Sequence, residues 1–264
     1  MIKKIIKHSY SALIFAFLYT PIVVLIVFSF NANKSRGQWG GFSLKWYYSL
    51  FQNKEILAAL YNTIFIAIVS ALIATIVGTI AAIGLYYMRR RPRSIIMNIS
   101  YLPVLSPDIV TGVSLLVLFM ALSIPLGRVS LLLAHITFNI PYVILSVMPK
   151  LKQMNRHTFE AAQDLGARPS QALRKVILPE IMPGVISGFI LAITMSIDDF
   201  VISFFTAGSG VSTLSITIYS MARKGIKPEI NALSTIMFVV VIALLLIVNL
   251  RTTREKKPPA TDCN

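Results

Sequence analysis

Long apolar runs alternate with short polar segments along almost the whole chain. Six of these runs are long enough to cross a bilayer as helices, because roughly 20 mostly apolar residues span its hydrocarbon core. They are residues 10–30, 62–88, 95–122, 129–149, 181–205 and 232–250. The pattern therefore predicts an all-α integral membrane protein with six transmembrane helices, organised as a single transmembrane domain over residues 1–264.

The first apolar run follows three lysines, an arrangement that also occurs in secretory signal peptides. Its apolar stretch is too long for the core of a signal peptide, and no cleavage site made of small residues follows it. We therefore expect residues 10–30 to be retained as the first transmembrane helix.

The basic residues predict the orientation, since short cytoplasmic loops of membrane proteins carry an excess of Lys and Arg. With the N-terminus in the cytoplasm, 17 of the 25 Lys and Arg residues lie in cytoplasmic segments. Both termini are then predicted to be cytoplasmic.

The composition supports the membrane class and excludes others. Hydrophobic residues make up 56% of the 264 and charged residues only 13%, whereas soluble domains carry about 25% charged residues. A water-soluble enzyme and a disordered chain are both excluded on this ground. The net charge of +15 is explained by the topology, so no nucleic acid partner is expected. Cys263 is the only cysteine, which leaves no disulfide framework.

The external loops differ in character. Residues 31–60 contain Trp39, Trp46, Tyr47 and Tyr48, which we interpret as an aromatic belt at the membrane interface. Residues 212–225 have a helical apolar period and end at a glycine, which predicts a short amphipathic helix. The tail, residues 251–264, is polar and contains Pro258 and Pro259, so we expect it to be disordered.

The largest cytoplasmic segment, residues 150–180, has a pattern typical of two short helices. The first is expected from about residue 157 to Leu165, with Gly166 as its stop. The second is expected to begin near Pro169 and to end at Pro179. Such a hairpin, with small side chains exposed, is a candidate binding site for another protein. The alternative is an amphipathic hairpin lying on the lipid headgroups.

This segment resembles the EAA motif of ABC importer permeases. The matching positions are Glu160, Ala161, Ala162, Gly166, Val176 (where isoleucine is usual), Leu178 and Pro179. The resemblance implies a type I (MetI-like) permease fold in which this loop couples to a separate ATPase. The coupling residues that it implies are Glu160, Ala161, Ala162, Asp164, Leu165, Gly166 and Pro179. No phosphate-binding loop is found in the sequence, so the chain is expected to be no enzyme, to have no cofactor and to depend on a partner for ATP binding and hydrolysis.

Further segments are similar to the permease subunits of spermidine/putrescine importers. They are residues 106–110, 135–138, 160–166, 196–199 and 228–232. The resemblance implies a polyamine substrate delivered by a periplasmic binding protein, and a place in the bacterial inner membrane. It also implies two ATPase subunits and a second homologous permease as partners. The preference between spermidine and putrescine stays open, as does the choice between heterodimer and homodimer.

Three carboxylates in apolar surroundings are candidates for a cation path. An acidic residue at the bilayer centre costs about 2.5–3.5 kcal/mol on the insertion scale. Counted along straight helices at about 1.5 Å per residue, Asp108 lies roughly 21 Å and Asp198 roughly 26 Å from the inner surface. Asp199 follows directly, and adjacent helical residues point about 100° apart, so which of the two faces the path stays open. The alternative is that these acids pair with a base or cap a helix that ends early.

Other polar and small residues are weaker site candidates or are expected to serve packing and hydrogen bonding. Glu229 and Tyr101 are weaker candidates for the substrate path. His135 and Asn139 share one face of the fourth span and predict hydrogen bonds between helices. A stripe of small residues in the fifth span predicts close packing at a subunit interface: Gly184, Gly188, Ala192 and Ser196. Neither a catalytic group nor a metal site is indicated. Pro103 and Pro107 predict a break or kink just before Asp108.

Two other functions compete with polyamine import. A related ABC importer for another small solute shares every feature except the acids. A self-sufficient cation channel or secondary transporter explains the acids but leaves the segment at 150–180 without a role.

Overall fold

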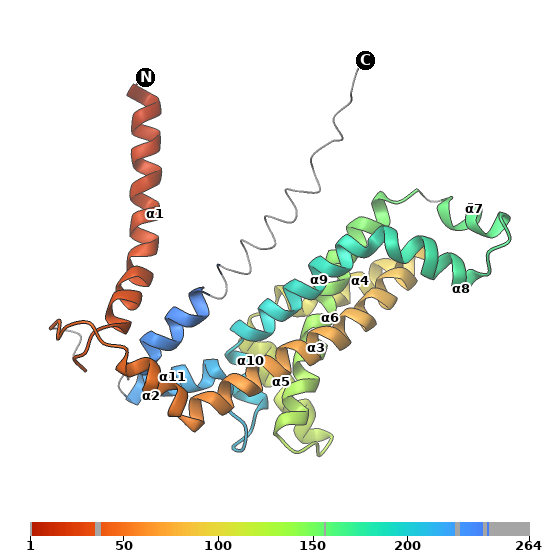
Figure 1. Cartoon of the computed structure of the whole chain (residues 1–264). Coiled ribbons are helices and arrows are strands. Elements are labelled where there is room, and N and C mark those ends of the chain that lie inside the picture. Colours follow the sequence, from red (N-terminus) through yellow and green to blue (C-terminus); the bar gives the residue numbers. More distant parts are fainter. Residues whose placement is uncertain (1, 35–37, 156, 225–227, 240–241, 243–264) are drawn as a thin grey trace. The chain divides into compact units, whose positions relative to one another are not determined.

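The computed structural model describes residues 2–34, 38–155, 157–224, 228–239 and 242, and these are predominantly helical. The chain divides into two compact units, Met1–Leu57 with Ser220–Asn264, and Ala58–Tyr219. The helices in chain order are α1 (Ile2–Ser29), α2 (Lys45–Gln52), α3 (Lys54–Tyr87), α4 (Arg90–Leu105), α5 (Asp108–Ala121), α6 (Arg128–Gln153), α7 (Thr158–Asp164), α8 (Pro169–Ala172), the π-helical turn η1 (Leu173–Ile177), α9 (Leu178–Asp198), α10 (Val201–Thr206) and α11 (Leu214–Lys224) (Figure 1). The all-helical prediction is confirmed.

Four of the predicted spans are confirmed as helices with the length and composition needed to cross a membrane. They are His8–Ser29, Lys54–Tyr87, Arg128–Gln153 and Pro169–Asp198. Of the sixth predicted span, the structure describes an apolar helix over Glu229–Val239, and most of its remainder lies outside the described residues. The predicted disordered tail lies outside them too. The amphipathic helix expected over residues 212–225 is confirmed as α11, although its predicted stop, Gly225, is not among the described residues.

The third span, predicted over residues 95–122, is divided into two helices. The helices α4 and α5 meet at an angle of 108°. Between them, Ser106 and Pro107 have extended ψ angles of 145° and 137°. Ser106 avoids the helical region because it precedes a proline. The predicted break before Asp108 is confirmed. The depth given for Asp108 assumed a straight helix and therefore does not hold.

The fifth span also departs from its predicted limits, residues 181–205. Its helix is continuous from Pro169 to Asp198, so Pro179 does not end the preceding loop helix as predicted. The π-helical turn η1 explains this, because the N–H of Leu178 bonds to the carbonyl of Leu173, one residue further back than in an α-helix. This wider turn accommodates the missing N–H of Pro179.

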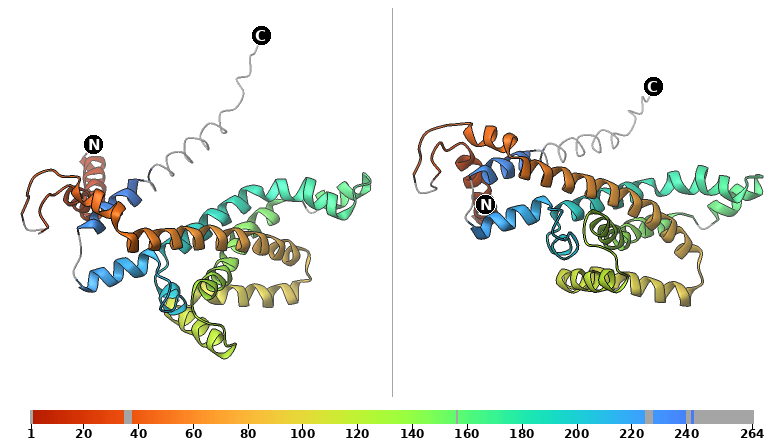
Figure 2. Two further views of the ribbon diagram at one scale, coloured as in Figure 1. Left: turned by 60° about the horizontal axis from the view of Figure 1, so that its bottom comes forward. Right: turned by 90° about the horizontal axis from the view of Figure 1, so that it is seen from below.

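The helices α3, α6 and α9 run side by side and enclose the core of the second unit (Figure 2). Small residues permit this close approach. A Cβ at Gly184 would lie 2.8 Å from Cγ of Lys150, and one at Gly188 would lie 3.3 Å from Cα of Val143. Both contacts are with α6 of the same chain. The prediction that this stripe packs at a subunit interface is therefore wrong, since α6 already covers it.

In the first unit, the loop after α1 is closed by aromatic side chains. The indole N–H of Trp46 donates to the carbonyl of Asn31 at 2.7 Å, and the hydroxyl of Tyr47 lies 2.8 Å from Oγ of Ser29. Trp39 and Tyr48 are 54% and 72% exposed. The predicted interfacial belt is thus wrong for Trp46, which is buried and fixes the loop.

Candidate functional site

The loop after α6 forms a hairpin whose turn depends on Gly166. The φ angle of Gly166 is +86°, in the left-handed region that favours glycine. The N–H of Gly166 bonds to the carbonyl of Gln163 at 2.8 Å, and the N–H of Ala167 bonds to that of Ala162 at 3.1 Å. These two bonds make a Schellman motif, the usual end of a helix at a left-handed glycine. The predicted helix and its stop are confirmed.

The two sides of α7 have different surroundings. On the inner side, the ring of Phe159 packs against that of Tyr87 at the end of α3, with 5.5 Å between ring centroids. On the outer side, Leu165 is 90% exposed and Ala161 is exposed. An open hollow of about 400 Å³ lies here, lined by Asn155, His157, Thr158, Ala161, Ala162, Leu165 and Val176. An exposed leucine beside an apolar hollow is typical of a protein-binding surface.

The other predicted coupling residues lie on or near this surface. The carboxylate of Glu160 is 70% exposed and lies 3.1 Å from Nδ1 of His157. Asp164, at the end of α7, is also exposed. Pro179 lies apart from them, in the first turn of α9. The hairpin therefore gathers six of the seven predicted coupling residues in α7 and the turn after it.

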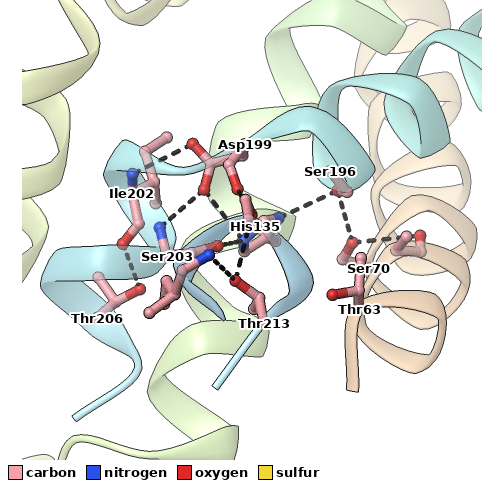
Figure 3. Close-up of polar contacts among 12 residues, drawn as sticks. Thr63, Ser70, His135, Ser196, Asp199, Ile202, Ser203, Thr206 and Thr213 are labelled. Carbon is pink, nitrogen blue, oxygen red and sulfur yellow. Dashed lines mark hydrogen bonds and ion pairs between the residues drawn. The ribbon is translucent and has the colours of Figure 1, made fainter. Parts of the chain in front are cut away.

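The carboxylate of Asp199 lies between α9 and α10 and bonds to the backbone (Figure 3). Its Oδ1 accepts the N–H of Ile202 at 3.1 Å, and its Oδ2 accepts that of Ser203 at 2.7 Å. The Asp199 side chain is 7% exposed, and Oδ2 lies 3.6 Å from Nε2 of His135. Asp199 therefore caps the N-terminus of α10, where the first N–H groups have no partner within the helix.

His135 and Asn139 connect three helices through hydroxyl groups. His135 lies 3.1 Å from Oγ of Ser196 by Nδ1 and 3.0 Å from Oγ of Ser203 by Nε2. Asn139 donates to Ser196 at 2.8 Å, and Ser196 lies 3.2 Å from Oγ of Ser70 in α3. The predicted hydrogen bonding between helices is confirmed. Ser70 and Ser203 escaped the sequence analysis, because a lone serine in an apolar helix gives no signal of which neighbour it will bond.

Asp108 and Asp198 differ from Asp199 in their surroundings. Asp108 is the first residue of α5 and Asp198 the last of α9, and both are exposed. Within the described residues, neither carboxylate makes a hydrogen bond or an ion pair. The carboxylate of Asp199, in contrast, is bound by backbone N–H groups of the protein itself.

The structure also describes the two weaker candidates for the substrate path. Tyr101, in α4, is 37% exposed. Glu229, in the first unit, accepts a hydrogen bond from the hydroxyl of Ser49 at 2.6 Å. Among the described residues, no group of three or more His, Cys, Asp and Glu side chains is arranged to hold a metal ion.

Comparison with known proteins gives one family. The family model described as "binding-protein-dependent transport system inner membrane component" matches residues 74–253. The chain is 42% identical over 246 residues to the spermidine/putrescine transport system permease protein PotC of Escherichia coli strain K12, covering 93% of both chains. It is 40% identical over 230 residues to the putrescine transport system permease protein PotI of the same strain, covering 84% of this chain and 82% of that protein.

Among solved structures, a bacterial ABC transporter involved in the import of the acidic polysaccharide alginate has a chain with the same fold. Its TM-score is 0.73, with 15% sequence identity and 96% of both chains covered. At this identity the likeness concerns the fold alone, which is that of an ABC importer permease.

Proposed function

The chain belongs to the family of binding-protein-dependent transport system inner membrane components, and from this premise we propose that it is a permease subunit that imports polyamines. The observation that carries the substrate class is the 40–42% identity, over most of the chain, to two permeases named for spermidine and putrescine transport. The exposed carboxylates of Asp108 and Asp198 support it, because an ammonium group attracts a charged acceptor without a partner.

In the proposed assembly this chain forms half of the pathway and a second homologous permease forms the other half. Two ATPase subunits supply ATP binding and hydrolysis, and one of them binds at the hollow beside α7 of this chain, so the chain itself needs no cofactor. A periplasmic binding protein delivers the substrate. We propose six spans in the bacterial inner membrane with both termini cytoplasmic, in agreement with the bias of the basic residues.

The continuous helix from Pro169 to Asp198 supplies a mechanism of coupling. Its 30 residues correspond to a length of about 45 Å. One end follows the hairpin turn at Gly166, and the other carries Asp198. A displacement of the hairpin by the ATPases therefore moves the helix as a rod and changes the position of the Asp198 carboxylate. On the other side of the hairpin, Phe159 transmits the same displacement to α3 through Tyr87.

The path carboxylates in this proposal are Asp108 and Asp198. Both are free for a polyamine, which carries several ammonium groups, and each attraction to a charged group is worth about 1.5–3 kcal/mol. Asp199 is assigned a structural role instead, because its carboxylate caps α10. Glu229 and Tyr101 remain secondary candidates.

Uptake of labelled spermidine and putrescine in a strain lacking this chain tests the substrate class. We expect uptake to be lost and to return with the wild-type chain, since the pathway is incomplete without it. An unchanged uptake of both polyamines, together with lost uptake of another solute, would favour an importer of that solute.

Coupling is tested with Gly166→Val. A β-branched residue is strained at a φ of +86° by more than about 1 kcal/mol, so the turn is distorted while the spans stay intact. We expect normal membrane abundance, lost uptake and weaker retention of the ATPase during purification. Gly84→Val is the control, because a Cβ at Gly84 meets no atom within 4 Å. Full uptake in Gly166→Val would contradict the coupling role and favour a self-sufficient channel.

Orientation is tested by labelling single cysteines with an impermeant thiol reagent in a Cys263→Ser background. Cysteines at Arg91 and Lys175 are expected to react only from the cytoplasmic side, and one at Lys45 only from outside. Labelling of position 175 from outside would contradict the proposed topology.

A further inference from the structure

A basic cavity lies where the end of α3, the start of α4 and the end of α6 meet. Its volume is about 690 Å³, and its lining consists of Tyr86, Arg90, Arg93, Ser94, Met97 and Lys152. Half of these residues are cationic and none is acidic. The substrate path proposed above attracts cations, so this cavity, which attracts anions, belongs to a different site.

The guanidinium of Arg93 is held in place without being neutralised by a carboxylate. The guanidinium of Arg93 lies 6.0 Å from the ring centre of Tyr86, and its Nη2 lies 3.5 Å from Sδ of Met148. In the described part of the chain, ion pairs are formed by His135 and His157 with carboxylates, and Arg90, Arg93 and Lys152 take no part in any. Guanidinium groups in such a position suit the geometry of a phosphate, which they bind with two parallel hydrogen bonds.

The start of α4 adds to the positive potential. Its first residue, Arg90, lines the cavity, no side chain caps this terminus, and its first turn contains no acidic residue. The N-terminal end of a helix carries a partial positive charge and N–H groups without helical partners, both of which favour an anion.

The rest of α4 distinguishes a lipid from a soluble anion. Beyond the cavity, α4 exposes Ile95 by 61%, Ile99 by 58% and Leu102 by 60%. These residues recur at i, i+4 and i+7 and therefore form one apolar stripe along the helix. A basic cavity followed by an exposed apolar stripe matches a phospholipid, whose charged headgroup is joined to acyl chains.

We propose that this cavity binds the phosphate of an anionic phospholipid from the cytoplasmic leaflet. The inference rests on the proposed function only in taking this end of α3 and α6 as the cytoplasmic surface. Tyr86 lines the cavity, and its neighbour Tyr87 packs on Phe159 of α7. A bound lipid therefore stabilises the part of α3 against which the coupling hairpin rests.

The test compares two double variants with the same loss of charge. Arg90→Gln/Arg93→Gln removes two cavity cations, and Arg89→Gln/Arg91→Gln removes two neighbours that do not line the cavity. The full-length chain is purified and placed in nanodiscs of phosphatidylcholine with or without phosphatidylglycerol. Retained phosphatidylglycerol is counted by native mass spectrometry, and thermal unfolding is measured in both lipids. Neither readout depends on polyamine uptake, so failure here is distinct from failure of the proposed function.

We expect the cavity variant to lose phosphatidylglycerol affinity by about tenfold for each charge-assisted contact removed. The thermal stabilisation by phosphatidylglycerol is expected to be lost with it, whereas the control variant keeps both. If the cavity variant does not fold, Arg90→Gln/Lys152→Gln replaces it, because that pair leaves the Arg93 contacts in place.

Two results would overturn the proposal. Equal losses in the cavity and control variants would mean that the lipid responds only to the general charge of the loop. Stabilisation by inorganic phosphate or glycerol phosphate in detergent, equal to that by phosphatidylglycerol and lost in the same cavity variant, would assign the site to a soluble anion. Retention of the lipid in the presence of either soluble phosphate supports the proposal.

Discussion

Two helices of the second unit are interrupted, and each interruption carries an acidic residue. At the first interruption Asp108 is the first residue of α5, and at the second Asp199 lies between α9 and α10. The Asp108 carboxylate is exposed and has no bonding partner among the described residues. The Asp199 side chain is 7% exposed and accepts two backbone N–H groups. Both acidic residues lie at an interruption of a helix, yet one carboxylate is exposed and the other is buried and hydrogen-bonded.

The difference follows from how each interruption is made. Pro107 ends α4 by its own ring and has no N–H, and its carbonyl accepts the N–H of Val110 at 2.9 Å. The hydroxyl of Ser106 also donates to the carbonyl of Leu102 at 2.7 Å, and the Asp108 carboxylate takes no part in the interruption. At the second interruption no proline is present, and the unpaired N–H groups at the start of α10 need an acceptor. Asp199 supplies it, which leaves Asp198 to face outward.

The largest effect is expected from Asp199→Ala. The change removes a helix cap and a buried partner of His135, and each such loss costs about 1–2 kcal/mol. We expect a fall in the free energy of unfolding of about 2 kcal/mol or more, with reduced abundance in the membrane. The measurement is chemical unfolding in detergent together with quantitative immunoblotting. Asp198→Ala is the matched control, and equal stability of the two variants would contradict the assignment of Asp199 as a cap.

The second effect concerns transport at unchanged stability. Asp108→Asn and Asp198→Asn each keep the size of the side chain but remove the attraction to an ammonium group. We expect polyamine uptake per assembled complex to fall by about tenfold, with normal abundance. Glu180→Gln is the control, since Glu180 is an exposed carboxylate at the other end of α9. Wild-type uptake in the Asp108→Asn/Asp198→Asn double variant would remove both carboxylates from the mechanism.

Local signals in the sequence predicted local structure. Gly166 was predicted as a helix stop because glycine alone adopts its φ without strain, and the pair His135 and Asn139 was predicted to bond because polar groups in an apolar helix need partners. Tertiary effects could not be predicted. Whether the stripe at Gly184 meets another subunit or α6 depends on which helix approaches it. Likewise, the helix continues through Pro179 because a π-helical turn precedes it, and nothing in the local sequence predicts that turn.

The smallest effect is expected from Ser203→Ala, at the second interruption. The hydroxyl of Ser203 is buried and lies 3.0 Å from Nε2 of His135. Hydrogen bonds between helices in membranes average about 0.6 kcal/mol, and Nε2 keeps a carboxylate oxygen of Asp199 at 3.6 Å. The free energy of unfolding should therefore fall by only about 1 kcal/mol. Ser187→Ala is the control, because the Ser187 hydroxyl is exposed and bonds to the Pro183 carbonyl of its own helix.

The Ser203→Ala variant separates the two parts of the Asp199 cluster. If Asp199 acts chiefly as a cap, its two N–H bonds survive the loss of Ser203, and the double variant Asp199→Ala/Ser203→Ala is only slightly less stable than Asp199→Ala. If the cluster instead depends on the whole chain of contacts through His135, Ser203→Ala alone costs as much as Asp199→Ala. Unfolding measurements on the two single variants and the double variant form a cycle that distinguishes these cases. A loss in Ser203→Ala equal to that in Asp199→Ala would overturn the contrast between an interruption made by proline and one made by a carboxylate cap.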